Sequence, residues 1–123
     1  MIVFLTSSPS GALDVPNDAH LLDESNHFVD NLKKYWKKDM KALMVSAYPD
    51  SYMANDEMTS FFYDCFNNSG VPVVSFDLLD KRNLDVVVND YDVIMLAGGH
   101  VPTQNDFFKR IHLKERLALF DGI

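Results

Sequence analysis

The sequence contains a single cysteine and few basic residues. Because Cys65 has no partner cysteine, no internal disulfide can form, and we expect a reducing, cytoplasmic location. Eighteen acidic residues against eleven basic ones give a formal net charge of −7, which argues against nucleic acids or anionic membranes as partners, since both need a basic face. No apolar run reaches the ~18 residues of a membrane-spanning helix. Residues 1–5 are too few, and lack the positive start, for a signal peptide.

The composition is that of a globular protein with one domain. Of the 123 residues, 47% are hydrophobic and 12% aromatic, which is far from the composition of disordered chains. A chain of this length buries about two-thirds of the surface that its unfolded form exposes. We therefore expect residues 1–123 to form a single domain with its own core.

The most informative stretch covers residues 92–105. Five consecutive apolar residues, 93–97, lead directly into Gly98-Gly99, and a segment rich in Phe and Leu follows. This pattern predicts a buried parallel strand, a glycine turn and a helix. Glycine permits positive φ and lets a ligand approach the backbone N–H groups, and open α/β sheets bind ligands at the carboxyl ends of their strands. The turn is our first candidate site, although Gly-Gly could equally serve only to connect strand and helix.

Further strands and helices are predicted along the rest of the chain. Apolar runs predict strands at residues 2–6, 42–47 and 71–76, the first of them central in the sheet. Helical spacing predicts helices over residues 26–38 and 58–66, the second closed by Gly70, and beyond residue 105 with a break near 111–112. Residues 12–24 are expected to form a long loop, and residues 81–89 remain ambiguous. The alternation predicts an α/β fold with a mainly parallel sheet and helices on both faces.

Other reactive side chains carry little functional signal. His20 and His27 are seven residues apart, unlike the i, i+4 histidines of metal-binding helices, so no metal site is predicted. Ser7 and Ser8 have no histidine and acid at a definable spacing and are poor candidates for a nucleophile. Cys65 falls within an aromatic helical pattern and is expected to pack in the core.

Three short segments carry a resemblance to a known family. They are Gly98-Gly99-His100-Val101-Pro102-Thr103-Gln104-Asn105, Leu5-Thr6-Ser7-Ser8-Pro9 and Phe120-Asp121-Gly122-Ile123. With them the chain resembles the N-terminal part of a peptidase E family protein, an aspartyl-dipeptidase-like serine peptidase. The resemblance implies a class I glutamine amidotransferase-like, flavodoxin-like fold: a three-layer α/β/α sandwich, here truncated before the nucleophile elbow. Many members carry Gly-Gly-Gly-Asn-Thr at the turn, so the different residues here leave substrate preference open.

The resemblance also implies which parts of a site this chain carries. The serine of a Gly-x-Ser-x-Gly elbow is expected beyond Ile123, with its histidine and acidic partners, and no such motif occurs in the sequence. No catalytic residue and no cofactor are therefore expected here, and we expect the chain alone to be inactive. Gly98 and Gly99 would supply oxyanion-hole N–H groups, with substrate binding by His100, Thr103 and Gln104. His100 could equally hydrogen-bond its own loop.

The implied activity is that of a serine-type peptidase that cleaves small peptides, after an N-terminal aspartate, through an acyl-enzyme. The alternative is a non-catalytic, flavodoxin-like ligand-binding or interaction domain. A glutamine amidotransferase with a cysteine nucleophile is a third possibility, but Cys65 lies in the second predicted helix and cannot fill that role. A truncated sheet leaves a strand edge unpaired, so we expect a homo-oligomer or self-association through that edge.

Overall fold

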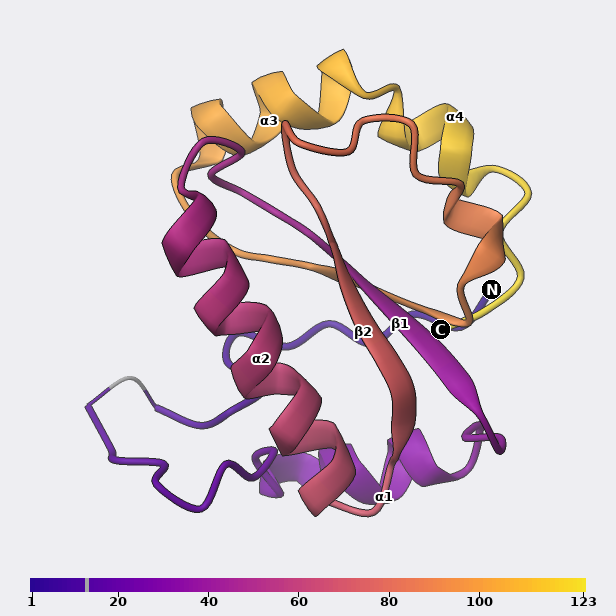
Figure 1. The fold of residues 1–123 in the computed structure, drawn as a ribbon. Coiled ribbons are helices and arrows are strands. Elements are labelled where there is room, and N and C mark those ends of the chain that lie inside the picture. Colours follow the sequence, from indigo (N-terminus) through magenta and orange to yellow (C-terminus); the bar gives the residue numbers. More distant parts are fainter. Residues whose placement is uncertain (13) are drawn as a thin grey trace.

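The computed structural model describes residues 1–12 and 14–123 (Figure 1). Its elements, in chain order, are the 3-10 helix η1 (Ser25–His27), α1 (Phe28–Lys33), β1 (Met40–Val45), α2 (Tyr52–Asn68), β2 (Val73–Leu79), the 3-10 helix η2 (Val88–Asp90), β3 (Val93–Leu96), α3 (Val101–Arg110) and α4 (Leu113–Leu117). No helix in the described residues has the length and apolar character needed to cross a membrane.

The three strands form an open sheet in the order β2-β1-β3, and both strand pairs are parallel. At the end of β1, Val45 pairs with Leu79 on one side and with Leu96 on the other. All of β1 except Lys41 is buried, as expected for a parallel strand that is covered on both faces. The strands predicted at 42–47, 71–76 and 93–96 are confirmed with small shifts at their ends.

Side chains of β1 alternate between two hydrophobic clusters. Ala42 and Met44 belong to a cluster that includes buried residues of α1 and α2. Leu43 and Val45 belong to the other cluster, with buried residues from the α3 and α4 region. Successive side chains of a strand point to opposite faces, so the clusters lie on opposite sides of β1. The protein is an α/β protein with an all-parallel open sheet, which is compatible with a flavodoxin-like fold.

The prediction of a central strand at residues 2–6 is wrong. The segment has no regular secondary structure. Its one backbone hydrogen bond to another described residue runs from the Ile2 N–H to the Gly122 carbonyl at 2.8 Å. Val3 and Leu5 are 65% and 95% exposed. The central position belongs to β1, whose two edges are taken by β2 and β3, so this apolar segment has no central ladder to join.

The helices follow the sequence pattern, with changes at their ends. The helix predicted over residues 26–38 is shorter, because Asn26 and His27 both have φ of 57° and separate η1 from α1. The predicted closure of α2 is confirmed: Gly70 has φ of 78°, and the Val71 N–H donates to the Phe66 carbonyl. His112, with φ of 51°, separates α3 from α4 and confirms the predicted break.

The predicted loop at residues 12–24 contains no helix or strand in its described part, residues 12 and 14–24; Leu13 lies outside the described residues. Four hydrogen bonds attach this loop to α2 and its C-cap, one of them from Asn68 Nδ2 to the Ala19 carbonyl. His20 Nδ1 lies 3.0 Å from Asp64 Oδ2, Asn68 Nδ2 donates to the His20 carbonyl, and the Leu22 N–H donates to Ser69 Oγ.

Candidate functional site

The candidate site lies where β1 and β3 end side by side. These strands are neighbours in the sheet but not in the sequence, because the chain passes from β1 to β2 on one side before it returns to β3 on the other. Open α/β sheets bind their ligands at the carboxyl ends of the strands, where strand order reverses in this way. The loops that leave β1 and β3 at this point are residues 46–51 and 97–100.

The glycine turn begins immediately after the last hydrogen bond between β3 and its neighbour β1. The Ala97 N–H still donates to the Val45 carbonyl at 3.0 Å. The next two N–H groups, of Gly98 and Gly99, donate no hydrogen bond to another described residue. Both glycines are exposed, so these N–H groups can reach a ligand.

Only one of the two glycines is required by packing. A Cβ on Gly99 would lie 2.6 Å from Tyr48 Cε2 and 2.9 Å from the Cβ of Ala47, whereas a Cβ on Gly98 would meet nothing within 4 Å. Neither glycine has a positive φ, so the left-handed conformation expected for this turn is not used. Close approach to the Tyr48 ring, rather than an unusual dihedral angle, explains the glycine at 99.

Tyr48 is a residue of this site that the sequence analysis did not identify. Its phenol oxygen accepts a hydrogen bond from the His100 N–H at 2.8 Å, so it joins the loop after β1 to the turn after β3. The side chain is partly exposed, and its O–H proton remains available for a ligand. The available signal was its position directly after the strand predicted at residues 42–47, because the carboxyl ends of parallel strands lie at one edge of the sheet.

The three predicted substrate-binding residues all take part in the local structure of the turn. His100 Nδ1 lies 2.9 Å from Thr103 Oγ1. Gln104 donates from Nε2 to the Ala97 carbonyl at 2.5 Å and from its backbone N–H to the His100 carbonyl at 3.0 Å. His100 therefore does hydrogen-bond within its own loop, while its exposed ring leaves Nε2 accessible. A role of these three residues in substrate binding stays a prediction.

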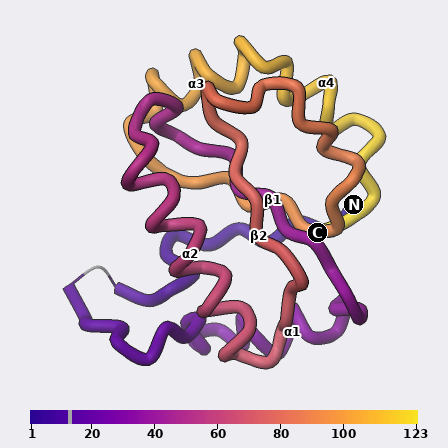
Figure 2. The backbone as a smooth tube through the Cα atoms, in the orientation of Figure 1, coloured from indigo at the N-terminus to yellow at the C-terminus, as the bar shows by residue number. Residues whose placement is uncertain are grey.

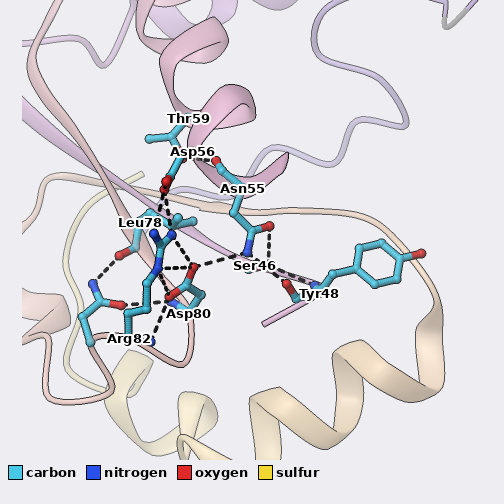
Figure 3. A network of polar contacts seen from close by, with 9 residues as sticks. Ser46, Tyr48, Asn55, Asp56, Thr59, Leu78, Asp80 and Arg82 are labelled. Atoms are coloured by element: carbon cyan, nitrogen blue, oxygen red, sulfur yellow. Dashed lines mark hydrogen bonds and ion pairs between the residues drawn. The ribbon is translucent and has the colours of Figure 1, made fainter. Parts of the chain in front are cut away.

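A buried polar network holds the Tyr48 loop against α2 (Figure 3). Ser46, which follows β1, donates from Oγ to Asn55 Oδ1 at 2.9 Å and accepts from the Tyr48 N–H at 3.0 Å. Asn55, in the first turn of α2, donates from Nδ2 to the Tyr48 carbonyl at 2.9 Å. The backbone of Tyr48 is thus bonded at both its N–H and its carbonyl, which fixes the loop that carries the phenol.

The same network continues to Asp80, which follows β2 and is 1% exposed. Asn55 Nδ2 lies 3.3 Å from its carboxylate, and Arg82 binds it at 2.7 Å while also pairing with Asp56 at 2.7 Å. Burial acts to raise the pKa of Asp80, but hydrogen bonds from Arg82 and Asn55 outweigh it and hold the pKa below its ordinary value. The hydrogen bond from Arg82 likewise lowers the pKa of Asp56. Asp80 is therefore an ionised structural anchor.

A complete nucleophilic site is not present in the part of the chain that the structure describes. No hydrogen bond there joins a serine hydroxyl to a histidine ring. The polar side-chain contacts of the described histidine rings are those of His20 with Asp64, His27 with Asp30, and His100 with Thr103. Cys65 is fully buried, and burial raises the pKa of its thiol to about 11, which confirms it as a core residue. No group of three His, Cys, Asp or Glu residues among the described positions is arranged to hold a metal ion.

The donors in the loops at the carboxyl ends of β1 and β3 suit an oxygen ligand. The N–H groups of Gly98 and Gly99, the phenol of Tyr48 and the exposed ring of His100 lie in two adjoining loops, and no carboxylate of a described residue hydrogen-bonds to any of them. A carbonyl oxygen or a carboxylate accepts hydrogen bonds from such groups. No protein-family model, curated protein or solved structure matches the chain.

Proposed function

We propose that the chain is the oxyanion-binding part of a serine-type peptidase of the peptidase E family. The observation that carries the proposal is the pair of N–H groups at Gly98 and Gly99, which donate to no other described residue and precede the His100 N–H bound by the Tyr48 phenol, at the point where strand order reverses. Donors in this position stabilise the oxyanion of a tetrahedral intermediate, and the loss of one such donor typically costs about a hundredfold or more in rate.

The arrangement of the sheet supports the fold that the proposal requires. Two hydrophobic clusters on opposite sides of β1 support a three-layer α/β/α sandwich of the class I glutamine amidotransferase-like kind. The Ile123 N–H donates to the Asp92 carbonyl at 2.9 Å, and the Ile94 N–H donates to the Ile123 carbonyl at 2.8 Å. These two bonds support a further parallel strand beside β3, which is where the family resemblance expects the strand that leads to the nucleophile elbow.

In this proposal the chain binds and polarises the substrate but does not cleave it. The scissile carbonyl of a small peptide with an N-terminal aspartate accepts hydrogen bonds from Gly98 and Gly99, while Tyr48 and His100 contact the rest of the substrate. The serine, its histidine base and the acid come from residues outside these 123. An oxyanion hole without a nucleophile gives almost no turnover. The lone, buried cysteine suits a reducing, cytoplasmic compartment.

A titration of the isotope-labelled chain with the dipeptide aspartyl-leucine tests this role. We expect NMR shift changes at the amides of Gly98, Gly99 and His100. Gly98→Pro removes one N–H donor, and Gly98→Ala is its matched control, because Ala keeps the N–H and its Cβ meets nothing. We expect Gly98→Ala to bind as the wild type does and Gly98→Pro to bind about tenfold more weakly.

Two results would contradict the proposal. Equal dipeptide binding by Gly98→Pro and Gly98→Ala would show that the Gly98 N–H does not bind the substrate. Turnover of an aspartyl amide by the isolated chain, with contaminating peptidase excluded, would contradict the absence of a nucleophile.

The alternative is a non-catalytic, flavodoxin-like ligand-binding domain that binds its ligand at the same glycine turn. It is favoured by the lack of a serine–histidine contact among the described residues. The same titration separates the two functions when inorganic phosphate and a mononucleotide are added in place of the dipeptide. Shifts at Gly98 and Gly99 with these anions, and none with the dipeptide, would select the alternative.

A further inference from the structure

A polar cavity lies beside β2 and shares no residue with the glycine turn. Figure 2 shows α2 alongside β2, and the cavity is lined by one face of α2, by β2 and by Asn83 and Tyr91. It is open to solvent and measures about 550 Å³, which is within the size range of small-molecule sites. We call it the β2 cavity. None of its lining residues belongs to the loops at 46–51 and 97–100, so a ligand here is separate from the proposed substrate.

The α2 wall of the β2 cavity is polar. Its residues are spaced i, i+3, i+4 and i+7, so they share one face of the helix; they are Asp56, Thr59, Ser60 and Tyr63. The Thr59 hydroxyl is buried and donates to the Asn55 carbonyl at 2.7 Å. Ser60 and Tyr63 are exposed, and neither hydroxyl hydrogen-bonds to another described residue. The wall therefore offers a hydroxyl and a phenol to a ligand.

The β2 cavity contains one carboxylate, that of Asp77, which forms no ion pair with a described residue. Asp77 lies in β2, and its Oδ2 accepts a hydrogen bond from the Tyr91 hydroxyl at 2.8 Å. The other carboxylate in the lining, Asp56, differs because both of its oxygens accept hydrogen bonds from Arg82. No lysine, arginine or histidine is among the described residues that line the cavity. The cavity therefore carries one negative charge that is not compensated.

Tyr91 orients the carboxylate of Asp77. Burial raises the pKa of the Tyr91 phenol to about 12, and the hydrogen bond to Asp77 and the charges of Asp77 and Asp90 act in the same direction. The phenol therefore stays protonated at neutral pH and remains a donor to Asp77. Oδ1 of Asp77 accepts no hydrogen bond from another described residue, so it is available to a donor on a ligand. The two acidic side chains beside Tyr91 favour a ligand with a positive charge.

Aromatic side chains give the β2 cavity a second means of attracting a cation. Tyr63, Phe76 and Tyr91 all line it. The faces of aromatic rings attract ammonium groups, and the apolar part of an organic cation packs against the same rings. A metal ion suits the cavity poorly, because hard cations take about six or more oxygen ligands and only Asp77 offers an unpaired carboxylate. No group of three potential metal-ligating side chains occurs among the described residues.

We propose that the β2 cavity binds a small organic cation, a primary ammonium group on an apolar stem. The ammonium group donates to Asp77 Oδ1, and the stem packs against the rings of Tyr63 and Tyr91. The ligand carries a single positive charge, because the cavity has a single uncompensated carboxylate. The inference does not rest on the proposed catalytic role, since the cavity and the glycine turn share no residue.

The test is an NMR titration of the isotope-labelled chain with phenethylamine, whose ammonium group is positively charged at neutral pH. The matched neutral compound is 2-phenylethanol, in which a hydroxyl replaces the ammonium group. We expect saturable shift changes at the amides of Ser60, Tyr63 and Asp77 with the amine, and none at Gly98 and Gly99. The alcohol should bind about tenfold more weakly or worse, because it loses the charge-assisted hydrogen bond to the carboxylate.

Three variants locate the binding to the β2 cavity. Asp77→Asn removes the charge from an exposed side chain, so the fold should tolerate it, and we expect amine binding to weaken about tenfold. Asp106→Asn is the matched control, because it changes the net charge equally at an exposed residue of α3 that does not line the cavity. It should bind the amine as the wild type does. Tyr63→Ser removes one ring and should weaken binding about two- to fivefold. Dipeptide shifts at Gly98 and Gly99 should persist in Asp77→Asn, which separates this inference from the proposed function.

Four outcomes would overturn the inference. The first two are no saturable binding of phenethylamine and equal binding of 2-phenylethanol. The third is equal binding of the amine by Asp77→Asn and Asp106→Asn, which would show only a general attraction of cations to an acidic chain. The fourth is a titration with calcium chloride that shifts the same amides at lower concentration than the amine does. That result would assign the β2 cavity to a metal ion.

Discussion

The ring of Tyr48 lies against the backbone of Gly99, so closely that a Cβ at position 99 would come within 2.6 Å of Tyr48 Cε2. The phenol oxygen of the same side chain accepts the N–H of His100. One tyrosine after β1 thus determines how the turn after β3 is placed. The glycine at 99 is required by this contact, since its backbone has no positive φ.

We expect Gly99→Ala to destabilise the protein by about 1–3 kcal/mol, because the added methyl overpacks the contact with Tyr48 and Ala47. Gly98→Ala is the control, since its methyl enters open space and should change stability far less. The measurement is urea unfolding of both variants beside the wild type. Equal midpoints for the two alanine variants would show that the ring moves aside without cost.

We expect Asp80→Asn to destabilise the protein by about 1.5–3 kcal/mol, the range for hydrogen bonds to a charged group. The carboxylate is buried and is the common partner of Arg82 and Asn55, so its loss disturbs the network that holds the Tyr48 loop. Asp56→Asn is the comparison, because this carboxylate is exposed and its pair with Arg82 is screened by solvent. Denaturant unfolding that ranks Asp56→Asn as the more damaging change would contradict this account.

The lowered pKa of Asp80 predicts a loss of stability in acid. A carboxyl whose pKa is lower in the folded than in the unfolded protein stabilises the fold above its unfolded value, near 3.8. This contribution declines as the pH falls below that value and through the lower native pKa. Unfolding curves collected from neutral pH to pH values below 3.8 should show a steeper loss for the wild type than for Asp80→Asn. If the stability of the wild type and of Asp80→Asn fell equally with pH, Asp80 would not be the cause of the acid sensitivity.

We expect Cys65 to react very slowly with iodoacetamide in the native protein. Its side chain is fully buried, and burial raises the pKa of the thiol to about 11, so little thiolate exists at neutral pH. Modification followed by mass spectrometry should become fast in urea, where the core is open. Rapid labelling without denaturant would show that α2 opens readily from the sheet.

The amino-acid sequence alone determined the elements that depend only on residues close together in the chain. The apolar run of β3, the glycine that closes α2 and the break before α4 are local signals, and all three are confirmed. Burial of Cys65 followed equally from the helical spacing of its apolar neighbours. Local pattern suffices in these cases because periodicity and backbone preference act over only a few residues.

Only the tertiary structure decided the features that depend on contacts between residues far apart in the sequence. Residues 2–6 have the composition of a buried strand, but they are not the central strand, because that position belongs to β1 and both of its edges are paired with β2 and β3. Tyr48 meets Gly99, and Asn55 meets Asp80, only because parallel strands bring their carboxyl ends to one edge. The glycine turn was visible as a motif. The contact of Tyr48 with this turn and the burial of Asp80 depend on packing between residues far apart in the sequence, which no local sequence pattern indicates.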